Sequence, residues 1–341
     1  MYKHSQACYN KLKKTVDLCG LTKVRKRIIT IGLNEIISKC SKQEGIKMAR
    51  PGKVDYHVHY YLDSCASPDM TLPVIDREAR KMGLEEIAVL KHYSAALPNG
   101  EQDWVSWHVI KEDQFQRYLQ EMKAYQPAEG LKIFSGVETE LVNDGGDINI
   151  PLEKQELIDS IALSVHYIPE MEGVKEKFLY HPRAQAPLME TDETAKKAMK
   201  TWMEQVRDLG SAYFIEHLVR GYVKAFEKYP KIHQASHMYD GLFPLRDYRI
   251  PYEELGEKKI IELMEPLMEA MVRYDVLWEL LPEPIGNENI LHRANEMGVR
   301  FIASADGHSI NGTWGRFPDH VQAEELIDSL GLCKGIIHWE K

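Results

Sequence analysis

From residue 54 onward, short apolar runs alternate with segments of helical periodicity, and this alternation constrains the fold more than any single motif. The runs predict seven strands, over residues 54–59, 86–90, 131–137, 160–165, 211–215, 275–280 and 299–304. The helical segments span residues 72–82, 113–125, 194–208, 257–273, 287–297 and 322–329. Because strand and helix repeat without a hairpin signal, we expect an α/β protein with a parallel sheet. The predicted fold is a closed, TIM-like (βα)7 barrel.

An open, doubly wound sheet is the alternative fold with the same alternation. No Gly-x-Gly-x-x-Gly sequence follows any predicted strand, so the usual support for a dinucleotide site in such a sheet is missing. Three predicted helices are followed by glycine, at Gly83, Gly210 and Gly298, as is common where a helix ends. Two connections, residues 167–191 and 218–254, are too long for simple turns. We expect them to shape a substrate pocket.

Charge is distributed unevenly along the chain. Residues 1–53 carry 13 Lys and Arg against 3 Asp and Glu, a net charge of +10, whereas the remainder carries 30 against 49, a net charge of −19. Apolar residues in the basic segment recur at helical spacing. We therefore predict a basic helical extension over residues 1–52 and a barrel domain over residues 53–341. A nucleic-acid-binding extension is the less favoured alternative, because no helix-turn-helix or zinc-finger pattern is clear.

The composition also bears on where the protein resides. No run of about 18 apolar residues occurs, so we expect neither a membrane span nor a membrane partner. The first ten residues lack the apolar stretch of a secretory signal. The five cysteines show no paired spacing, which predicts free thiols in a reducing compartment; they are Cys8, Cys19, Cys40, Cys65 and Cys333. A cytoplasmic protein is the default expectation.

Residues with metal-binding side chains lie at the ends of the apolar runs, where a barrel collects its catalytic groups. They are His57, His59, His92, Glu138, His166, His217, Glu279, Asp306 and His308. His57 and His59 are two apart in a strand, so both imidazoles should face the barrel interior and can chelate one divalent ion. Asp306 follows a buried run and needs a partner, because burying an unpaired charge is costly. The series predicts a multi-metal hydrolase site.

Six stretches together resemble the motifs of the polymerase-and-histidinol-phosphatase (PHP) superfamily. They are Asp55-Tyr-His-Val-His59, Val89-Leu-Lys-His92, Ser135-Gly-Val-Glu138, Leu163-Ser-Val-His166, Ile215-Glu-His217 and Ser304-Ala-Asp-Gly-His308. The resemblance covers residues 53–332. Within the superfamily, the layout is most similar to histidinol-phosphate phosphatases, which have a long helical segment before the glutamate strand and a long loop after Ser-Val-His. The resemblance implies a distorted (βα)7 barrel and a metal-dependent phosphoesterase.

The resemblance also implies two to three divalent ions, of zinc, manganese or iron, at the carboxyl ends of the strands. The first ion would be held by His57, His59, Glu138 and Asp306. The second would be held by Glu138 as a bridge, His166 and His217. The third would be held by His92, His308 and one residue from the loop after the first strand.

Two positions depart from the family pattern. Cys65 replaces the histidine that the family has eight residues beyond the first His of His-x-His. As a thiolate it would favour zinc; alternatively Asp63 or Asp69 serves the third ion, or Cys65 is a small buried residue without a metal role. Lys91 stands where the family usually has an acidic residue. It would either weaken the third site or bind a substrate phosphate or carboxylate.

The implied reaction is hydrolysis of a small phosphate monoester, with histidinol phosphate as the leading candidate, by a metal-activated hydroxide. Asp306 and His308 are the predicted catalytic residues for proton transfer. The residues predicted to bind the substrate phosphate are Lys91, Arg183 and Arg220. Residues on the long loops that can shape the pocket are Trp104, Trp107, Tyr167, His181, His233 and His237. We expect Glu279 to orient a ligand rather than to bind metal itself.

Three other functions fit parts of the pattern. A PHP-type phosphodiesterase or nuclease would use the same metals, and the basic N-terminal segment is the feature that supports it. A non-catalytic, degenerate barrel is disfavoured because seven of the eight ligand positions of the family are retained. An amidohydrolase would also bind metal ions within a barrel, but the order of the motifs here fits that class less well.

Overall fold

The computed structural model describes residues 52–93, 112–166, 169–174, 193–247, 250–282, 286–312 and 315–339. Seven parallel strands form one sheet in chain order. They are β1 (Val54–His59), β2 (Glu86–His92), β3 (Lys132–Glu140), β4 (Ser160–Ser164), β5 (Ile232–Ala235), β6 (Leu277–Leu280) and β7 (Phe301–Ala303). Six of the seven predicted strands and the parallel sheet are thereby confirmed.

The segment that follows β7 closes the sheet into a barrel. Gly307 pairs with Val58 of β1 as an isolated parallel bridge. The His59 N–H donates to Gly307 O at 2.8 Å, and the Gly307 N–H donates to His57 O at 2.9 Å. A Cβ at Gly307 would lie 2.7 Å from Phe317 Cβ, so only glycine fits here. The sequence Asp306-Gly-His308 therefore joins the two ends of the sheet.

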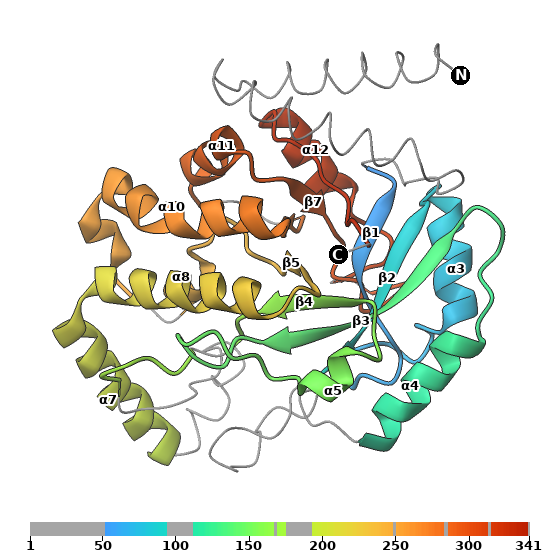
Figure 1. Ribbon diagram of the computed structural model, residues 1–341, viewed down its shortest axis with the longest axis horizontal. Helices are drawn as coiled ribbons and strands as arrows, with labels where there is room; N and C mark the ends of the chain where they lie inside the picture. Colours follow the sequence, from blue (N-terminus) through green and yellow to red (C-terminus); the bar gives the residue numbers. More distant parts are fainter. Residues whose placement is uncertain are drawn as a thin grey trace.

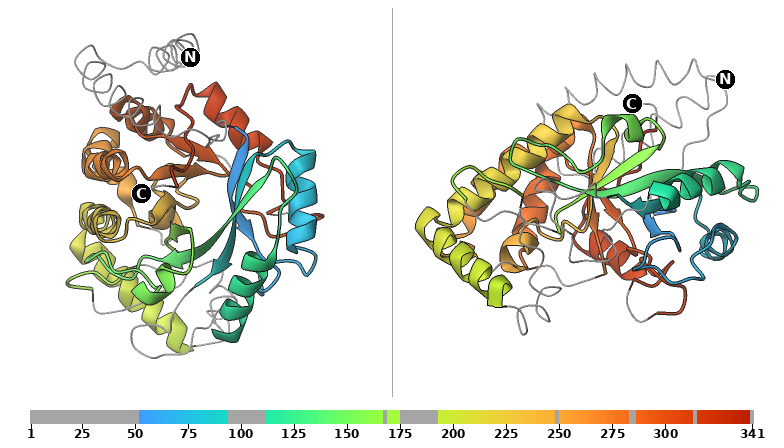
Figure 2. Two further views of the ribbon diagram at one scale, coloured as in Figure 1. Left: turned by 45° about the vertical axis from the view of Figure 1, so that its right-hand side comes forward. Right: turned by 90° about the horizontal axis from the view of Figure 1, so that it is seen from below.

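Helices surround the strands (Figures 1 and 2). Their bounds are α3 Leu72–Lys81, α4 Glu112–Ala124, α5 Leu152–Gln155, α7 Glu193–Leu209, α8 Ser211–Lys228, α9 Phe243–Asp247, α10 Glu257–Tyr274, α11 Glu288–Met297 and α12 Val321–Ser329, with a 3-10 turn η1 at Tyr252–Leu255. All six predicted helices are present, each end within one residue of the prediction. The alternation of strand and helix is that of a distorted (βα)7 barrel.

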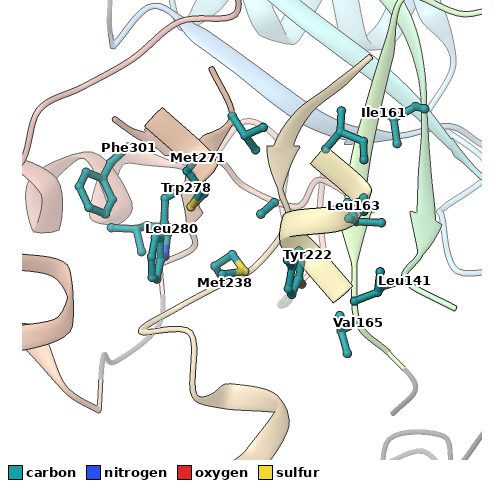
Figure 3. Packing of buried hydrophobic residues seen from close by; sticks show 14 of the residues in the cluster. Leu141, Ile161, Leu163, Val165, Tyr222, Met238, Met271, Trp278, Leu280 and Phe301 are labelled. Atoms are coloured by element: carbon teal, nitrogen blue, oxygen red, sulfur yellow. The ribbon is translucent and has the colours of Figure 1, made fainter. Parts of the chain in front are cut away.

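The strands bury apolar side chains on both faces, as expected for a parallel barrel. Outward-facing residues such as Ile161 and Leu163 pack with Tyr222 of α8, as Figure 3 shows. Inward-facing residues form a separate cluster that includes Tyr56, Leu90 and Ile302. The outer cluster fixes the helices to the sheet, and the inner one fills the barrel.

One predicted strand is wrong. Residues 211–215 belong to α8, and the fifth strand is Ile232–Ala235 instead. The buried residues of α8 recur every three or four positions; they are Phe214, Ile215, Leu218, Val219, Tyr222, Ala225 and Phe226. This is the spacing of one helix face. Gly210, with a φ of 81°, ends α7 but leads into a second helix rather than a strand. The predicted long connection over residues 218–254 therefore contains most of α8, then β5 and α9.

The last described residues of the chain pack against the amino ends of the strands. Ile336 and Ile337 are buried in the inner apolar cluster. The Trp339 ring stacks on Phe134 at a centroid distance of 3.6 Å and meets Tyr56 edge-on at 5.4 Å. Its Nε1–H donates to Glu86 Oε2 at 3.0 Å. This end of the barrel is therefore packed rather than open.

Three expectations concern parts of the chain that are described little or not at all. The predicted basic extension lies outside the described residues, apart from Gly52. None of the described helices is long and apolar enough to cross a membrane. Cys65 is a free thiol, whereas Cys333 is in a disulfide, so the expectation of free thiols throughout is wrong for Cys333.

Candidate metal centre

The two histidines at the end of β1 direct their Nε2 atoms toward each other inside the barrel. The register of β1 against β2 shifts between Asp55 and Val58, which marks a β-bulge. Beyond the shift, His59 pairs with Leu90, a residue of the inner cluster. His59 therefore faces inward, and so does His57 two residues before it. Their Nε2 atoms lie 3.1 Å apart, in agreement with the prediction from the His-x-His spacing.

Two carboxylate oxygens complete a set of four donor atoms with these nitrogens. Asp306 Oδ1 lies 3.2 Å from His57 Nε2 and 3.1 Å from His59 Nε2. Glu138 Oε2 lies 3.4 Å from each nitrogen. A tetrahedral zinc ion bound at about 2.0–2.1 Å separates its ligands by about 3.3 Å. The spacing of these four donors, which we call the first cluster, suits one such ion.

The other oxygen of Glu138 belongs to a second cluster. Glu138 Oε1 lies 2.8 Å from His237 Nε2 and 3.6 Å from His166 Nε2. One ligand atom of each of these three residues lies within 4.8 Å of the others. Glu138 Oε2 is buried and accepts no hydrogen bond from the part of the chain that the structure describes. A buried carboxylate oxygen left in this state is costly, whereas a carboxylate between two cations is well satisfied.

A third cluster shares His59 with the first. It consists of His59, Cys65, His92 and His308, with ligand atoms within 4.8 Å of one another. His92 Nδ1 is 3.3 Å from Glu138 Oε2, and the rings of His59 and His308 are 3.9 Å apart. The three clusters are therefore contiguous and share Glu138 or His59.

Buried carboxylates orient the imidazoles from behind. His57 Nδ1–H donates to Glu279 Oε1 at 3.0 Å, and the same carboxylate accepts the backbone N–H of His237. His166 Nδ1–H donates to Glu140 Oε1 at 2.5 Å. Such contacts fix the tautomer, because the nitrogen that donates to the carboxylate leaves the other nitrogen to bind metal. The contact between Glu279 and His57 is the one that the predicted orienting role requires.

Asp55 ties β1 to the segment after β7. It accepts a hydrogen bond from the His57 N–H at 3.1 Å and another from Ser304 Oγ at 2.7 Å. Burial raises the pKa of this carboxyl group above its usual value. Both partners lie within two residues of candidate ligands, so Asp55 holds the His57 and Asp306 backbones in a fixed relation.

The electrostatics of the first cluster are dominated by burial and by opposed charges. Burial by itself would lower the pKa of His57, but Glu279, Asp306 and Glu138 raise that pKa well above 6.5. Burial would likewise raise the pKa of Glu138 and of Asp306, but the facing imidazoles lower both. The carboxylates therefore stay ionised and attract positive charge, which divalent cations can supply in place of protons.

The two neighbouring clusters differ in charge. Burial would lower the pKa of His166, but Glu140 and Glu138 raise it to about 9. Burial and the adjacent His59 lower the pKa of His308 to about 4, so this imidazole is neutral near pH 7. Burial raises the pKa of the Cys65 thiol, as do the Asp63 and Glu138 carboxylates. In the third cluster, the His308 imidazole and the Cys65 thiol are therefore both uncharged near pH 7 when no metal is bound.

Two candidate ligands have an uncommon backbone conformation. His237 has a φ of 34° and Asp306 a φ of 46°, in a region that residues other than glycine rarely adopt. His237 lies two residues beyond the end of β5, and Asp306 lies three residues beyond the end of β7. Such strain persists only where surrounding contacts hold it, and it concentrates at functional sites.

The structure separates His217 from the clusters. His217 lies in α8, where its Nδ1 is 2.5 Å from Asp144 Oδ2 and its ring stacks on Tyr213 at 3.8 Å. The prediction placed His217 beside Glu138 because it assumed a strand ending at residue 215. That strand does not exist, since residues 211–215 are helical, and the placement of His217 is wrong for the same reason. His237, which follows the true fifth strand, occupies the place beside Glu138.

The predicted phosphate-binding residues are engaged elsewhere or not described. Lys91 is buried and its ammonium pairs with Asp63, so it is not available to a substrate. The Arg220 guanidinium pairs with Asp144. Five further loop calls lie outside the described residues; these are Arg183, Trp104, Trp107, Tyr167 and His181. His233 contacts Ser160 Oγ and faces Trp339 at the opposite end of the barrel.

A signal for His237 was present in the sequence. Ile232-His-Gln-Ala-Ser-His237 is a short run with a small residue before the ligand, as in Phe301-Ile-Ala-Ser-Ala-Asp306. A search for apolar runs does not select this segment, because His233 and Gln234 make it polar. In the structure both side chains are buried within the barrel wall, so apolar content alone does not identify this strand.

Comparison with known proteins supports the fold. No family model and no curated protein matches the chain. A solved structure of a putative histidinol phosphatase from Listeria monocytogenes is 15% identical and has a TM-score of 0.50, covering 76% of this chain and 96% of that one. A histidinol phosphate phosphatase from Lactococcus lactis, solved with zinc, L-histidinol and phosphate, is 16% identical with a TM-score of 0.48 and covers 83% and 95%. At such identities, the Listeria likeness is evidence for a shared fold.

Proposed function

We propose that this chain is a metal-dependent phosphoesterase of the PHP type that hydrolyses a small phosphate monoester. The observation that carries the proposal is the position of Glu138, whose two oxygens face separate sets of buried histidines at the carboxyl ends of the strands. A carboxylate so placed suits a bridge between two divalent ions. Adjacent metal sites are a common means of cleaving phosphate esters.

The donor sets assign ligands to each proposed ion. The first set is His57, His59, Asp306 and Glu138, and the second is Glu138, His166 and His237. The third set is His92, His308 and Cys65, with His59 beside it. Zinc, manganese or iron would suit the mixed nitrogen and oxygen donors of the first two sets. When bound, such ions act as Lewis acids that activate water and neutralise phosphoryl charge.

The protein's own residues would hold the ligands and accept a proton. Asp306 is ionised because facing histidines lower its pKa, and it is the proposed proton acceptor. His308 Nδ1–H donates to Asp306 O at 2.7 Å, so its Nε2 is the nitrogen directed to chemistry or to metal. Glu279 and Glu140 keep His57 and His166 in the tautomers that ligation requires.

Histidinol phosphate is the first substrate to test. It follows from the motif resemblance and from the name of the Listeria protein of similar fold. The experiment compares turnover of histidinol phosphate, a generic aryl phosphate monoester and the matching diester by chelator-treated protein reloaded with zinc or manganese. We expect the monoesters to be cleaved and His57→Ala to abolish that cleavage.

The outcomes separate the candidate functions. Cleavage of the monoester but not of histidinol phosphate would retain the phosphatase and discard the substrate. Preference for the diester would favour a phosphodiesterase. Absence of bound metal and of turnover after reloading would overturn the proposal in favour of a non-catalytic barrel.

A further inference from the structure

The third cluster differs chemically from the first two because it contains sulfur. Its ligand atoms come from three histidines and from the Cys65 thiol. Cys65 lies in the loop between β1 and α3, and backbone hydrogen bonds tie that loop to the segment after β7. The Ser67 N–H donates to His308 O at 2.7 Å, and the Ala66 N–H donates to Asp63 O at 3.1 Å, which closes a turn around Cys65. These bonds hold the Cys65 backbone close to that of His308.

Cys65 is the only residue of this cluster that can become an anionic donor. Glu138 Oε2 and Asp306 Oδ1 lie 3.3 Å from His92 Nδ1 and 3.4 Å from His308 Nδ1, but the same two oxygens belong to the donor set of the first cluster. Asp63 is buried but its carboxylate pairs with Lys91 and accepts the His92 N–H. A cation bound only by neutral imidazoles, beside the Lys91 ammonium and two further cations, would be poorly compensated. Ligation by the thiolate supplies the missing negative charge.

We propose that Cys65, His92 and His308, beside His59, form a thiolate-ligated zinc site whose metal preference differs from that of the two adjacent sites. Sulfur and imidazole donors favour zinc over manganese and magnesium, whereas carboxylate-rich sites accept the harder ions. The proposal rests on the metal dependence argued above, but not on the identity of the substrate. It assigns to Cys65 a role in choosing the metal.

Cobalt substitution tests the sulfur ligand directly. Full-length protein is stripped with chelator and titrated with Co²⁺, and its near-ultraviolet absorption is recorded. The wild-type protein is expected to show a sulfur-to-cobalt charge-transfer band that Cys65→Ser lacks. The matched variant Cys65→His is expected to retain the number of bound ions but to lack the band, because it restores a nitrogen donor in place of sulfur.

Competition between metals tests the preference. Stripped protein is equilibrated with equal zinc and manganese, and the metal content is measured by mass spectrometry. Wild-type protein is expected to retain about one more zinc per chain than Cys65→Ser, with thermal melts showing that the variant remains folded. Wild-type protein that binds cobalt without the band, or an unchanged zinc content in Cys65→Ser, would overturn the inference. Phosphatase activity alongside either result would leave the proposed function standing.

Discussion

The two ends of the barrel are built from the same strands, but one end carries ionisable side chains and the other carries mainly apolar ones. The carboxyl ends gather buried histidines and carboxylates, with strained backbone at His237 and Asp306. The amino ends are filled by aromatic and aliphatic side chains, closed by Trp339 against Phe134. On β1 the apolar and the metal-binding parts of the interior begin at adjacent residues, because the bulge lets both Tyr56 and His57 face inward.

The carboxyl end can hold buried charges and strained backbone because the apolar packing at the amino end stabilises the fold. Barrels of this class separate the two tasks in this way. Two expectations follow. Substitutions in the three clusters should change metal binding and catalysis more than stability. Substitutions around Trp339 should change stability more than metal binding and catalysis.

The largest expected effect is loss of activity on substitution of the bridging carboxylate. Glu138→Gln keeps the shape of the side chain but removes the negative charge that faces both clusters. We expect turnover of the phosphate monoester to fall by at least about a hundredfold, with fewer ions bound per chain. Steady-state kinetics and metal analysis on the same sample check this. Retention of both metal content and turnover would contradict the bridging role.

At the opposite end, Trp339→Ala should affect stability rather than chemistry. The change removes the stack on Phe134 and the hydrogen bond to Glu86. Because Trp339 is only partly buried, we expect a loss near the lower end of the range of about 3–5 kcal/mol found for buried aromatic residues. Denaturant unfolding measures the loss. Metal content and turnover below the transition should match wild type, and Trp339→Phe should recover most of the stability.

Metal binding should tighten as pH rises. In the metal-free protein, neighbouring carboxylates raise the pKa of His57 well above 6.5 and that of His166 to about 9. Below these pKa values an ion must displace bound protons, so affinity grows by about tenfold per pH unit for each proton displaced. Competition with a metal indicator between pH 6 and about pH 9 measures the slope. A flat profile would show that the imidazoles are already neutral.

Lys91→Met should weaken metal binding at the third cluster without abolishing folding, because the loss of positioning by Asp63 is expected to outweigh the removal of a repelling ammonium. It leaves the Asp63 carboxylate without its ammonium partner, although that carboxylate positions the His92 backbone and lies 3.5 Å from His59 Nδ1. Loss of such supporting contacts costs about 10- to 100-fold in metal affinity. Titration of stripped protein should show one weakened ion while the others bind as in wild type. Uniform weakening of all ions would point to a general loss of structure.

Much of the arrangement at the carboxyl ends of the strands could be predicted from the sequence. The His-x-His spacing and the apolar run before Asp306 are local signals, and the structure brings both residues together. The orienting role of Glu279 followed from its place at a strand end. These predictions succeeded because strand order and chain order coincide in this sheet, so successive strand ends converge without rearrangement.

The prediction failed where local signals competed. Ala212-Tyr-Phe-Ile215 is as apolar as a strand and precedes a Glu-His pair, but its apolar face continues through Leu218 and Tyr222 at helical spacing. The true strand carries polar residues whose burial depends on contacts distant in sequence, such as Gln234 with Tyr56 O. The Lys91–Asp63 pair was missed for the same reason, because it joins residues on different elements.

The smallest expected effect on activity is that of His217→Ala. It is best compared with His237→Ala, because His237 occupies the place beside Glu138 that the sequence predicted for His217. His237→Ala removes a nitrogen 2.8 Å from Glu138 and should cost one bound ion and most of the turnover. Among the residues with described side chains, His217 has hydrogen-bond, ion-pair or ring contacts with Asp144, Arg220 and Tyr213. Its loss should leave metal content and turnover unchanged.

A change in stability is still expected for His217→Ala. The hydrogen bond to Asp144 involves an ionised carboxylate, and burial would raise the pKa of Asp144 while Arg220 and His217 lower it. Removing one partner should cost about 1–2 kcal/mol, since Arg220 continues to pair with the carboxylate. Thermal melts and metal analysis of the two alanine variants, run in parallel, measure both effects. If His217→Ala lost an ion and His237→Ala did not, the assignment of the second cluster would be reversed and α8, rather than β5, would supply its histidine.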